Sequence, residues 1–426
     1  MDISSQKDKN SNARLIFYVF LFALLVRLPV GFWLTNVFGS DYAIIAGNLA
    51  RGTGYSLDGI HPTAFRTPVY PLFLAGIIAL FGEQRVPVVM LLSFVGAINA
   101  GLCAWLGIKI FSRSVGLVAG LLYTIIPYLV QKESTTEGGF VTLGLLGGLC
   151  LLQAGLKNKR LIQIGLAGFM FAFAYLVRPT IGLIPVFVSI SLLAGLGKTR
   201  KPSWHIVSAV ILIVVFAIGI FPWAARNKKV FGRWYFGQTN FWHNVYIGNH
   251  RLSFDIYPYL SLDNFMPMVR PQVNRSSITN ELERELSLKQ LALTEIKNSN
   301  PRDIISKCLY RFLYMWNIRL VPYTDRLGND ALTGRTLDRK RSIFKNMAFS
   351  IPYLFLFIFA LLGAWQERKR PQLLLFIAGF LFFFSIPYML TIAYPRYTTQ
   401  VYFVLILLAA RGLVSILHLK SKYLDI

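Results

Sequence analysis

The sequence predicts an all-α polytopic membrane protein with about ten transmembrane helices, within a range of about ten to twelve, and further helices at the outer membrane surface. The chain has 426 residues, of which 55% are hydrophobic and only 15% are charged. Apolar runs of about 20 residues, long enough to cross a bilayer as a helix, recur along most of it. This composition excludes an ordinary soluble globular protein.

Ten apolar stretches are separated by short polar breaks. We expect transmembrane helices near residues 15–38, 87–108, 115–130, 139–156, 161–177, 179–197, 204–224, 348–365, 371–391 and 397–417. The first stretch is too long for the apolar part of a signal peptide and has no obvious cleavage site. We therefore expect it to remain in place as an anchor.

Lysine and arginine gather in alternate breaks. One set comprises Lys109 and Arg113; Lys157, Lys159 and Arg160; Lys198, Arg200 and Lys201; and Arg368, Lys369 and Arg370. The opposite breaks carry only Lys132, Arg178 and Arg396. By the positive-inside rule, this asymmetry predicts cytoplasmic N- and C-termini. The alternation requires that residues 68–82 do not span, so we expect them to form a helix that lies at the outer interface or is partly re-entrant.

The chain divides into three predicted parts. Residues 1–224 form a membrane module with a first outer loop at 39–87, residues 225–347 form a mostly helical outer segment, and residues 348–426 form the last transmembrane helices. Helices are expected at 279–298 and from Asn300-Pro301 to Trp316. The outer segment has 20 Lys and Arg against 10 Asp and Glu. That excess fits phosphate-bearing lipid or acidic glycan, and equally a solvated face beside anionic headgroups.

An aspartate and an arginine lie in the first outer loop. Asp41 is expected to open a short amphipathic helix resting on the membrane, with Tyr42 on its apolar face, and the glycines Gly52 and Gly54 are expected to end it. Arg66 follows Asp41 by 25 positions. Ionisable groups near a membrane are costly to keep, which makes both residues functional candidates.

Short motifs follow one another from the first apolar stretch to the last, all on the predicted outer side. They are Gly39-Ser40-Asp41-Tyr42, Gly52-Thr53-Gly54-Tyr55, Arg66-Thr67-Pro68-Val69-Tyr70-Pro71, Thr136-Glu137-Gly138, Val177-Arg178-Pro179, Arg226-Asn227, Ile247-Gly248-Asn249 and Pro395-Arg396-Tyr397. In this order and spacing they resemble the polyprenyl-phosphate-sugar-dependent glycosyltransferases of the GT-C fold. The resemblance is strongest to the bacterial branch of protein O-mannosyltransferases and lipid A aminoarabinose transferases. Many members carry two adjacent acids in the first loop, whereas Tyr42 follows Asp41 here.

The resemblance implies an inverting glycosyltransferase at the outer face of the bacterial inner membrane. Such a reaction needs a base for the acceptor hydroxyl and cations for the departing phosphate. We assign Asp41 as the base, with Asp58 a distant second, although an acid at this position also suits a helix N-terminus. Glu137 matches the second acid of the family and is expected to orient the acceptor or to position the partners of Asp41, whereas Glu133 is expected to be a solvated loop acid.

Three arginines are candidate ligands of the donor phosphate. Arg66 is preferred because guanidinium presents paired donors to phosphate oxygens, and its alternative role is an interfacial anchor. Arg396 and Arg226 are the other two candidates. Arg178, at the tip of a tight hairpin, is expected to make a structural or headgroup contact.

Four further residues on the predicted outer side are candidates for contact with the substrate. They are Tyr42, Tyr397, His243 and Asn249. The phenylalanines of the ninth stretch are expected either to line a prenyl groove or to face lipid; they are Phe376, Phe380, Phe382, Phe383 and Phe384. No cofactor and no metal site is assigned, since Asp41 and Glu137 are too few acids for a convincing one, although a divalent cation stays open.

The expected partners are a polyprenyl-phosphate sugar, membrane lipid, and an envelope glycan, glycolipid or protein acceptor. Nucleic-acid binding is not expected, because the basic residues largely punctuate membrane spans. The protein is expected to be a monomer. The main alternative is a lipid or glycan transporter or flippase, which would carry ionisable residues at the midplane of several spans, where only Arg27 lies here. A non-catalytic membrane scaffold is a third possibility.

Overall fold

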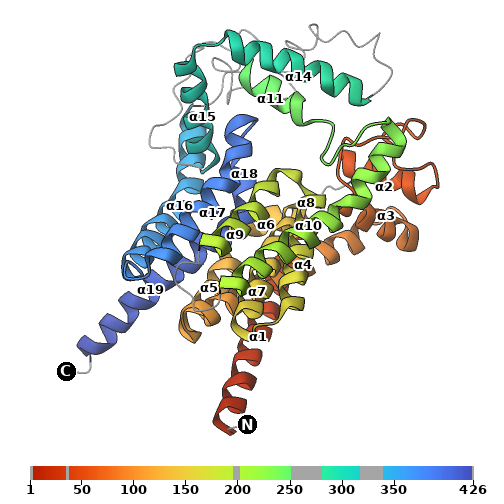
Figure 1. The fold of residues 1–426 in the computed structure, drawn as a ribbon. Helices are drawn as coiled ribbons and strands as arrows, with labels where there is room; N and C mark the ends of the chain where they lie inside the picture. The colour runs from red at the N-terminus through yellow and green to blue at the C-terminus, as the bar shows by residue number, and fades with distance from the viewer. Residues whose placement is uncertain (1–2, 35–37, 195–201, 251–280, 317–338, 425–426) are drawn as a thin grey trace.

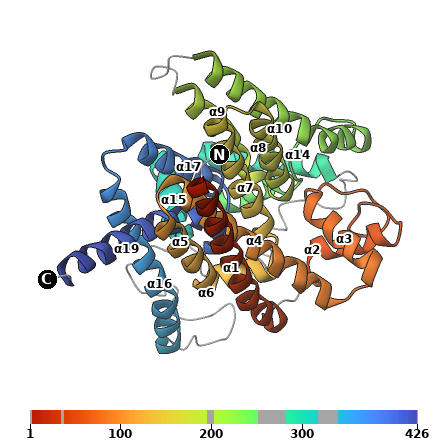
Figure 2. The ribbon, with the colours of Figure 1, turned by 90° about the horizontal axis from the view of Figure 1, so that it is seen from below.

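The regular secondary structure is helical in the part of the chain that the structure, a computed structural model, describes. That part comprises residues 3–34, 38–194, 202–250, 281–316 and 339–424. Within it the only β-type pairing is an isolated bridge between Ser56 and Pro62. The predicted all-α class is confirmed. Figures 1 and 2 show a helical bundle with a helical cap at one end and a small helical unit at one side.

Every predicted transmembrane stretch corresponds to one or more helices. In the first part these are α1 (Ile3–Leu34), α4 (Arg85–Ile110), α5 (Arg113–Ile125), α6 (Pro127–Thr135), α7 (Gly138–Asn158), α8 (Leu161–Val177), η1 (Pro179–Gly182), α9 (Leu183–Ala194) and α10 (Pro202–Phe231). In the last part they are α16 (Arg339–Gln366), α17 (Pro371–Leu390), α18 (Pro395–Thr398), η5 (Thr399–Val401) and α19 (Tyr402–Leu424). Residues 35–37 and 195–201, at the ends of two predicted stretches, lie outside the described residues.

By length and apolarity, six of the described segments are able to cross a membrane. They are Asn10–Leu34, Arg85–Ile110, Gly138–Asn158, Ser203–Phe231, Pro371–Leu390 and Pro395–Leu417. The predicted span at 115–130 consists of two helices, because α5 and α6 meet at a 66° bend. The bend lies at Pro127, which lacks the N–H that would continue the helix. As one broken span, this pair would be the seventh.

Helix α3 (Val69–Phe81) has 13 residues, which is about 20 Å of helix and too short for a bilayer core of about 30 Å. This length agrees with the expectation that residues 68–82 do not span. Figure 2 shows α3 and α2 (Asp41–Ala50) together at one side of the bundle.

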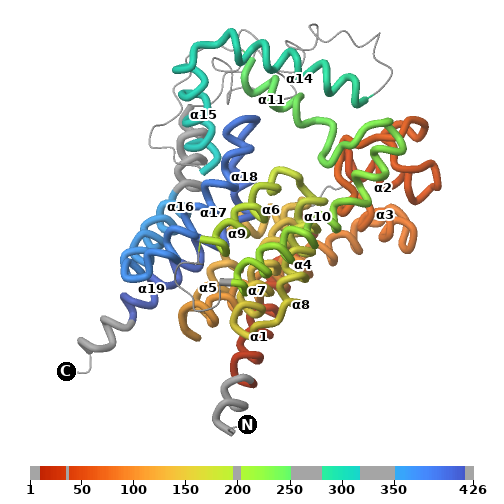
Figure 3. Tube along the Cα trace, in the orientation of Figure 1, coloured from red at the N-terminus to blue at the C-terminus, as the bar shows by residue number. Residues whose placement is uncertain are grey.

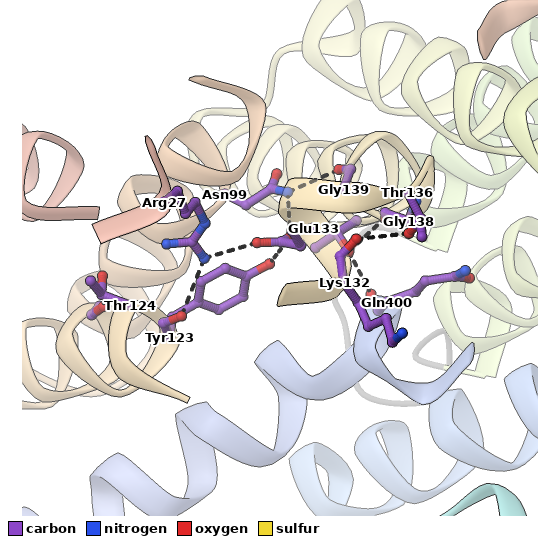
Figure 4. A network of polar contacts seen from close by, with 12 residues as sticks. Arg27, Asn99, Tyr123, Thr124, Lys132, Glu133, Thr136, Gly138, Gly139 and Gln400 are labelled. Atoms are coloured by element: carbon purple, nitrogen blue, oxygen red, sulfur yellow. Dashed lines mark hydrogen bonds and ion pairs between the residues drawn. The ribbon is translucent and has the colours of Figure 1, made fainter. Parts of the chain in front are cut away.

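A buried ion pair joins α1 to α6. Glu133 Oε2 lies 2.9 Å from Arg27 Nη2, and both side chains are almost fully buried. Figure 4 shows the rest of the network, in which Tyr123 Oη and Asn99 Nδ2 donate to Glu133 Oε1 at 2.6 and 2.8 Å. Gly96 makes room for it, since a Cβ there would lie 2.4 Å from Arg27 Nε. The expectation that Glu133 is a solvated loop acid is wrong, because its partners come from three other helices.

The cap consists of α11 (Phe241–Asn249), α14 (Glu281–Asn298) and α15 (Pro301–Met315). Figure 3 traces the chain from α10 through α11 into this cap, at the end of the bundle away from both termini. Helices α14 and α15 agree with the predicted helices; residues 279–280, 251–278 and 317–338 of the predicted outer segment lie outside the described residues.

Helix α15 holds the end of α11 with two buried cations. Lys307 Nζ donates to the carbonyls of Asn249 and His250 at 3.3 Å each, and Arg311 donates to the carbonyl of Gly248. Arg311 also donates to the carbonyl of Met389, on α17, at 2.7 Å. Cations stabilise the negative end of a helix, so α11, α15 and the end of α17 form one unit.

Candidate functional site

The first outer loop is fastened to the hairpin between α8 and η1. Thr67 Oγ1 donates to the carbonyl of Val177 at 3.0 Å. This bond connects the residue after Arg66 to the residue before Arg178. Two arginines that are 112 positions apart in the sequence therefore stand on adjoining backbone segments.

Asp41 is the first residue of α2 and pairs with Arg66. Ser40 caps the helix by accepting from the amide of Ala43, and Arg66 Nη2 lies 2.7 Å from Asp41 Oδ2. The Asp41 side chain is 42% exposed. Within the described residues, its second oxygen, Oδ1, has no hydrogen-bond partner. The pair therefore fixes one oxygen of the carboxylate and leaves the other open.

The apolar face of α2 does not rest on the membrane as predicted. Ile45 is fully buried, and the ring of Tyr42 packs edge-on against Tyr70 of α3 with centroids 5.2 Å apart. The Arg66 guanidinium lies over the Tyr42 ring at 4.8 Å. The protein interior, and not lipid, therefore holds the helix that carries Asp41.

Glu137 forms an ion pair with Arg178 at the start of α7. Burial alone would raise the pKa of Glu137. The positive charges of Arg178, Arg396 and Arg66 outweigh this effect, so the pKa is lower than its ordinary value. The carboxylate is thus kept ionised. Arg178 contacts Glu137 directly, and the charges of Arg396 and Arg66 also act on this carboxylate.

Arg396 and Tyr397, at the start of α18, complete the cluster. The Arg178 guanidinium lies 4.6 Å from the centroid of the Tyr397 ring, which stacks on Tyr388 at 4.7 Å. Arg396 lies over Tyr397 at 5.4 Å and is exposed. No carboxylate of the described residues lies within ion-pair distance of Arg396. Its charge is therefore available to an anion.

Lys132 is a second cation beside Arg396. The two charges interact electrostatically, and Lys132 Nζ lies 5.3 Å from the centroid of the Tyr128 ring. Figure 4 shows Lys132 on α6. Among the described residues, no carboxylate forms an ion pair with Lys132. Two adjacent cations that lack an acid favour a phosphate between them.

Arg226, on α10, binds the backbone of the first outer loop. Its Nη1 donates to the carbonyl of Thr63 at 2.9 Å and its Nη2 to that of Tyr55 at 3.5 Å. Its guanidinium lies over the rings of Tyr55 and Trp223, at 5.4 and 5.2 Å. These contacts hold the first outer loop against α10, and they engage donors that a phosphate would need.

The substrate-loop candidates separate into two groups. Tyr42 and Tyr397 lie with the charged residues around Glu137. Burial raises the pKa of Tyr42, and the charge of Glu137 raises it further. Tyr397 also interacts with Tyr42. Asn249 lies in the cap, where Nδ2 donates to the carbonyls of Val245 and Leu390 at 2.8 and 3.0 Å. His243 lies on α11 in the same cap. The Asn249 amide is thus bonded to backbone carbonyls of the cap and of α17.

Sequence reasoning did not assign a site role to Lys132 or Arg178. The signal for Arg178 was its position beside Pro179 on the predicted outer side, but its partner Glu137 is 41 residues away. Lys132 looked like one of the few cations of an outer break. Within the described ranges, no three His, Cys, Asp or Glu side chains gather in a way that would hold a metal ion.

The cap contains a buried acid that we expect to weaken it at high pH. Glu285, on α14, accepts from the amide of Trp242 at 2.6 Å, and burial raises its pKa from 4.5 to about 7. Because the folded pKa is the higher one, the stability contributed is complete below pH 4.5 and is lost as the pH rises through about 7.

Hydrogen exchange of the α11 amides checks this expectation. After correction for the intrinsic rate, their protection should fall about tenfold or more between pH 5.5 and pH 8.5. Glu285→Gln should give a nearly flat profile, because glutamine does not titrate. A wild-type profile as flat as that of the variant would contradict the proposed titration.

Comparison with known proteins gives one family match. Residues 61–221 match the family described as dolichyl-phosphate-mannose-protein mannosyltransferase. That segment contains Arg66, Lys132, Glu137 and Arg178. Among solved structures, ArnT from Cupriavidus metallidurans in the apo state aligns with a TM-score of 0.41 and 14% identity, over 93% of this chain and 77% of that one. No curated protein sequence matches significantly.

Proposed function

We propose that this chain, whose residues 61–221 match the mannosyltransferase family, is a GT-C glycosyltransferase that carries out an inverting transfer from a polyprenyl-phosphate sugar. The acceptor is a hydroxyl of an envelope glycan, glycolipid or protein at the outer face of the bacterial inner membrane. The observation that carries this proposal is the half-exposed Asp41–Arg66 pair beside the unpaired charge of Arg396.

Asp41 acts as the general base. Arg66 holds Oδ2, so that Oδ1 is directed to the acceptor and takes its proton. The acceptor oxygen forms the new bond to the anomeric carbon as the bond from that carbon to the phosphate oxygen breaks. The electron pair leaves with the phosphate. Attack opposite the leaving group inverts the anomeric centre.

The phosphate lies between Arg396 and Lys132 on this proposal. Both cations lack an acidic partner within the described residues, and charge that develops on the leaving phosphate is best stabilised by cations already in position. Arg66 offers a third contact, because its Nε is buried and has no hydrogen-bond partner in the described structure. A phosphate oxygen would satisfy that donor.

Glu137 orients the acceptor. Its pairing with Arg178 and its low pKa make it a poor proton acceptor, so it accepts hydrogen bonds from a hydroxyl and does not take the proton. The two acids therefore have different roles. Asp41 is half-exposed and acts as the base, whereas Glu137 is paired with Arg178 and positions the acceptor.

Reconstitution with a labelled polyprenyl-phosphate sugar in proteoliposomes tests the proposal. Transfer predicts label on the acceptor and a free polyprenyl phosphate. A flippase would move the label across the bilayer with the sugar still joined to its carrier. Recovery of intact labelled donor on the opposite leaflet, with none on any acceptor, would overturn the transferase.

Removing the phosphate cations is expected to weaken use of the donor. Arg396→Met and Lys132→Met should each raise the KM for the donor about tenfold to a hundredfold, as expected for a lost charged hydrogen bond of about 1.5–3 kcal/mol. Steady-state kinetics against donor concentration measures this change. Lys229→Met, which removes an exposed cation at the end of α10, is the matched control. An equal rise in KM for the control would assign the effect to general surface charge.

A further inference from the structure

A second candidate binding site lies at the end of the bundle opposite Asp41. Helices α4, α7, α9, α17 and α19 enclose a cavity of about 330 Å³ that is partly open to the outside. Its lining on α7 runs from Leu149 to Leu156, about 18–28 Å along the helix from Glu137. The cavity is therefore separate from the proposed transferase site.

The wall of this cavity is apolar. Among its lining residues, only four side chains carry polar atoms: Lys109, Gln153, Ser191 and Arg370. Ser191 is already bonded to its own helix, since its hydroxyl donates to the carbonyl of Phe187 at 2.8 Å. Phe376 and Phe380, two phenylalanines of the ninth stretch, are part of the apolar wall. A wall of this kind accommodates a hydrocarbon chain and offers a sugar almost nothing to bind.

Two cations lie where the helices of the cavity end. Lys109 is in the last turn of α4, and Arg370 immediately precedes α17. Lys109 Nζ lies 5.6 Å from the centroid of the Trp105 ring. Arg370 donates to the carbonyl of Ile110 at 3.3 Å, which ties the two helix ends together. The positive N-terminal end of the α17 dipole lies at the same place.

Glu367 partly neutralises the positive charge at this end of the cavity. Glu367 Oε2 lies 3.2 Å from Arg370 Nη1, while Glu367 Oε1 lies 2.7 Å from Arg411 Nε. One carboxylate is thus shared by two arginines, and Lys109 forms no ion pair within the described residues. The local balance is three cations against one acid, which leaves a net positive rim.

We infer that this cavity binds an anionic phospholipid, with one acyl chain against the apolar wall and the phosphate at Lys109 and Arg370. Its volume lies at the lower end of the range of about 300–1,000 Å³ for ligand pockets. Protein interiors leave few voids larger than a water molecule, so an apolar cavity that opens beside lipid is filled by it. The predicted orientation puts this end in the cytoplasmic leaflet, where anionic phospholipids are concentrated.

Native mass spectrometry of the full-length protein, titrated with phosphatidylglycerol or phosphatidylcholine of the same chains, tests the inference. We expect one phosphatidylglycerol to bind about tenfold or more tightly than phosphatidylcholine. The double variant Lys109→Ala with Arg370→Ala should remove this preference. The control double variant Lys157→Ala with Arg368→Ala removes one lysine and one arginine from exposed positions outside the cavity. It should keep the preference for phosphatidylglycerol.

A second variant tests binding of the acyl chain and leaves Lys109 and Arg370 unchanged. Ser191→Phe fills the cavity and should reduce binding of both lipids to the level of nonspecific adducts. Equal affinities for the two lipids in the wild type, or an equal loss in the control pair, would overturn the inference. Displacement of phosphatidylglycerol by an equimolar prenyl phosphate would likewise overturn it, since the occupant would then be the sugar carrier.

Discussion

Replacing Asp41 with asparagine is expected to lower the rate of sugar transfer by about 10²–10⁴-fold, the contribution of a positioned general base. Asparagine has nearly the same shape and suits the start of a helix as well as aspartate does. It cannot take the proton of the acceptor hydroxyl. Initial rates with saturating labelled donor and acceptor measure the loss.

Two observations separate this result from a structural effect. The variant should keep its thermal stability and its affinity for the donor, because Arg396 and Lys132 are unchanged. Asp58→Asn is the matched control: Asp58 is an exposed acid of the same loop, where it accepts from the amides of Ile60 and His61 at 2.9 and 2.8 Å. It should change transfer less than about twofold. Undiminished transfer by the Asp41 variant would end the assignment of this residue as the base.

Replacing Glu133 with alanine is expected to destabilise the folded protein by about 3–5 kcal/mol, the usual cost of leaving one member of a buried ion pair alone. The change would leave the guanidinium of Arg27, which is fully buried, without a counter-charge. It would also leave Tyr123 and Asn99 without their acceptor. Unfolding of the purified protein in mixed detergent micelles, followed by circular dichroism, measures the free energy.

The double variant Arg27→Met with Glu133→Leu distinguishes charge from shape. Buried ion pairs often exchange for apolar residues of similar volume at little cost, so the double variant should recover most of the lost stability. Glu133→Gln should fall between the wild type and the alanine variant, since it keeps an acceptor. A double variant as unstable as Glu133→Ala would show that the ion pair is not what stabilises this region.

The helix beginnings near the site were predictable because their signals are local. Ser40 before Asp41, and Asn300 before Pro301, are cap residues that act on amides two or three positions away. The apolar runs likewise predicted where the apolar helices lie, although only six of the described segments, or seven with the bent pair, are long enough to cross a membrane, against the ten predicted. Such features depend on a few neighbouring residues and not on the rest of the fold.

The pairing of charges was not predictable in the same way. The partner of Glu133 is 106 positions distant, and the bend at Pro127 carries this acid away from solvent. The sequence placed Glu137 and Arg178 on the same outer side without joining them. Asp41 and Arg66 were singled out by their motifs, and their contact depends on how α2 packs against α3. Long-range packing decides each of these points.

The cations of α15 have a consequence for how the cap can move. Since Lys307 and Arg311 tie the last turn of α11 to α15 and to the backbone of Met389, separating these helices would break several charge-assisted hydrogen bonds at once. We therefore expect α11, α15 and the end of α17 to move as one unit, and α11 not to separate from the other two alone.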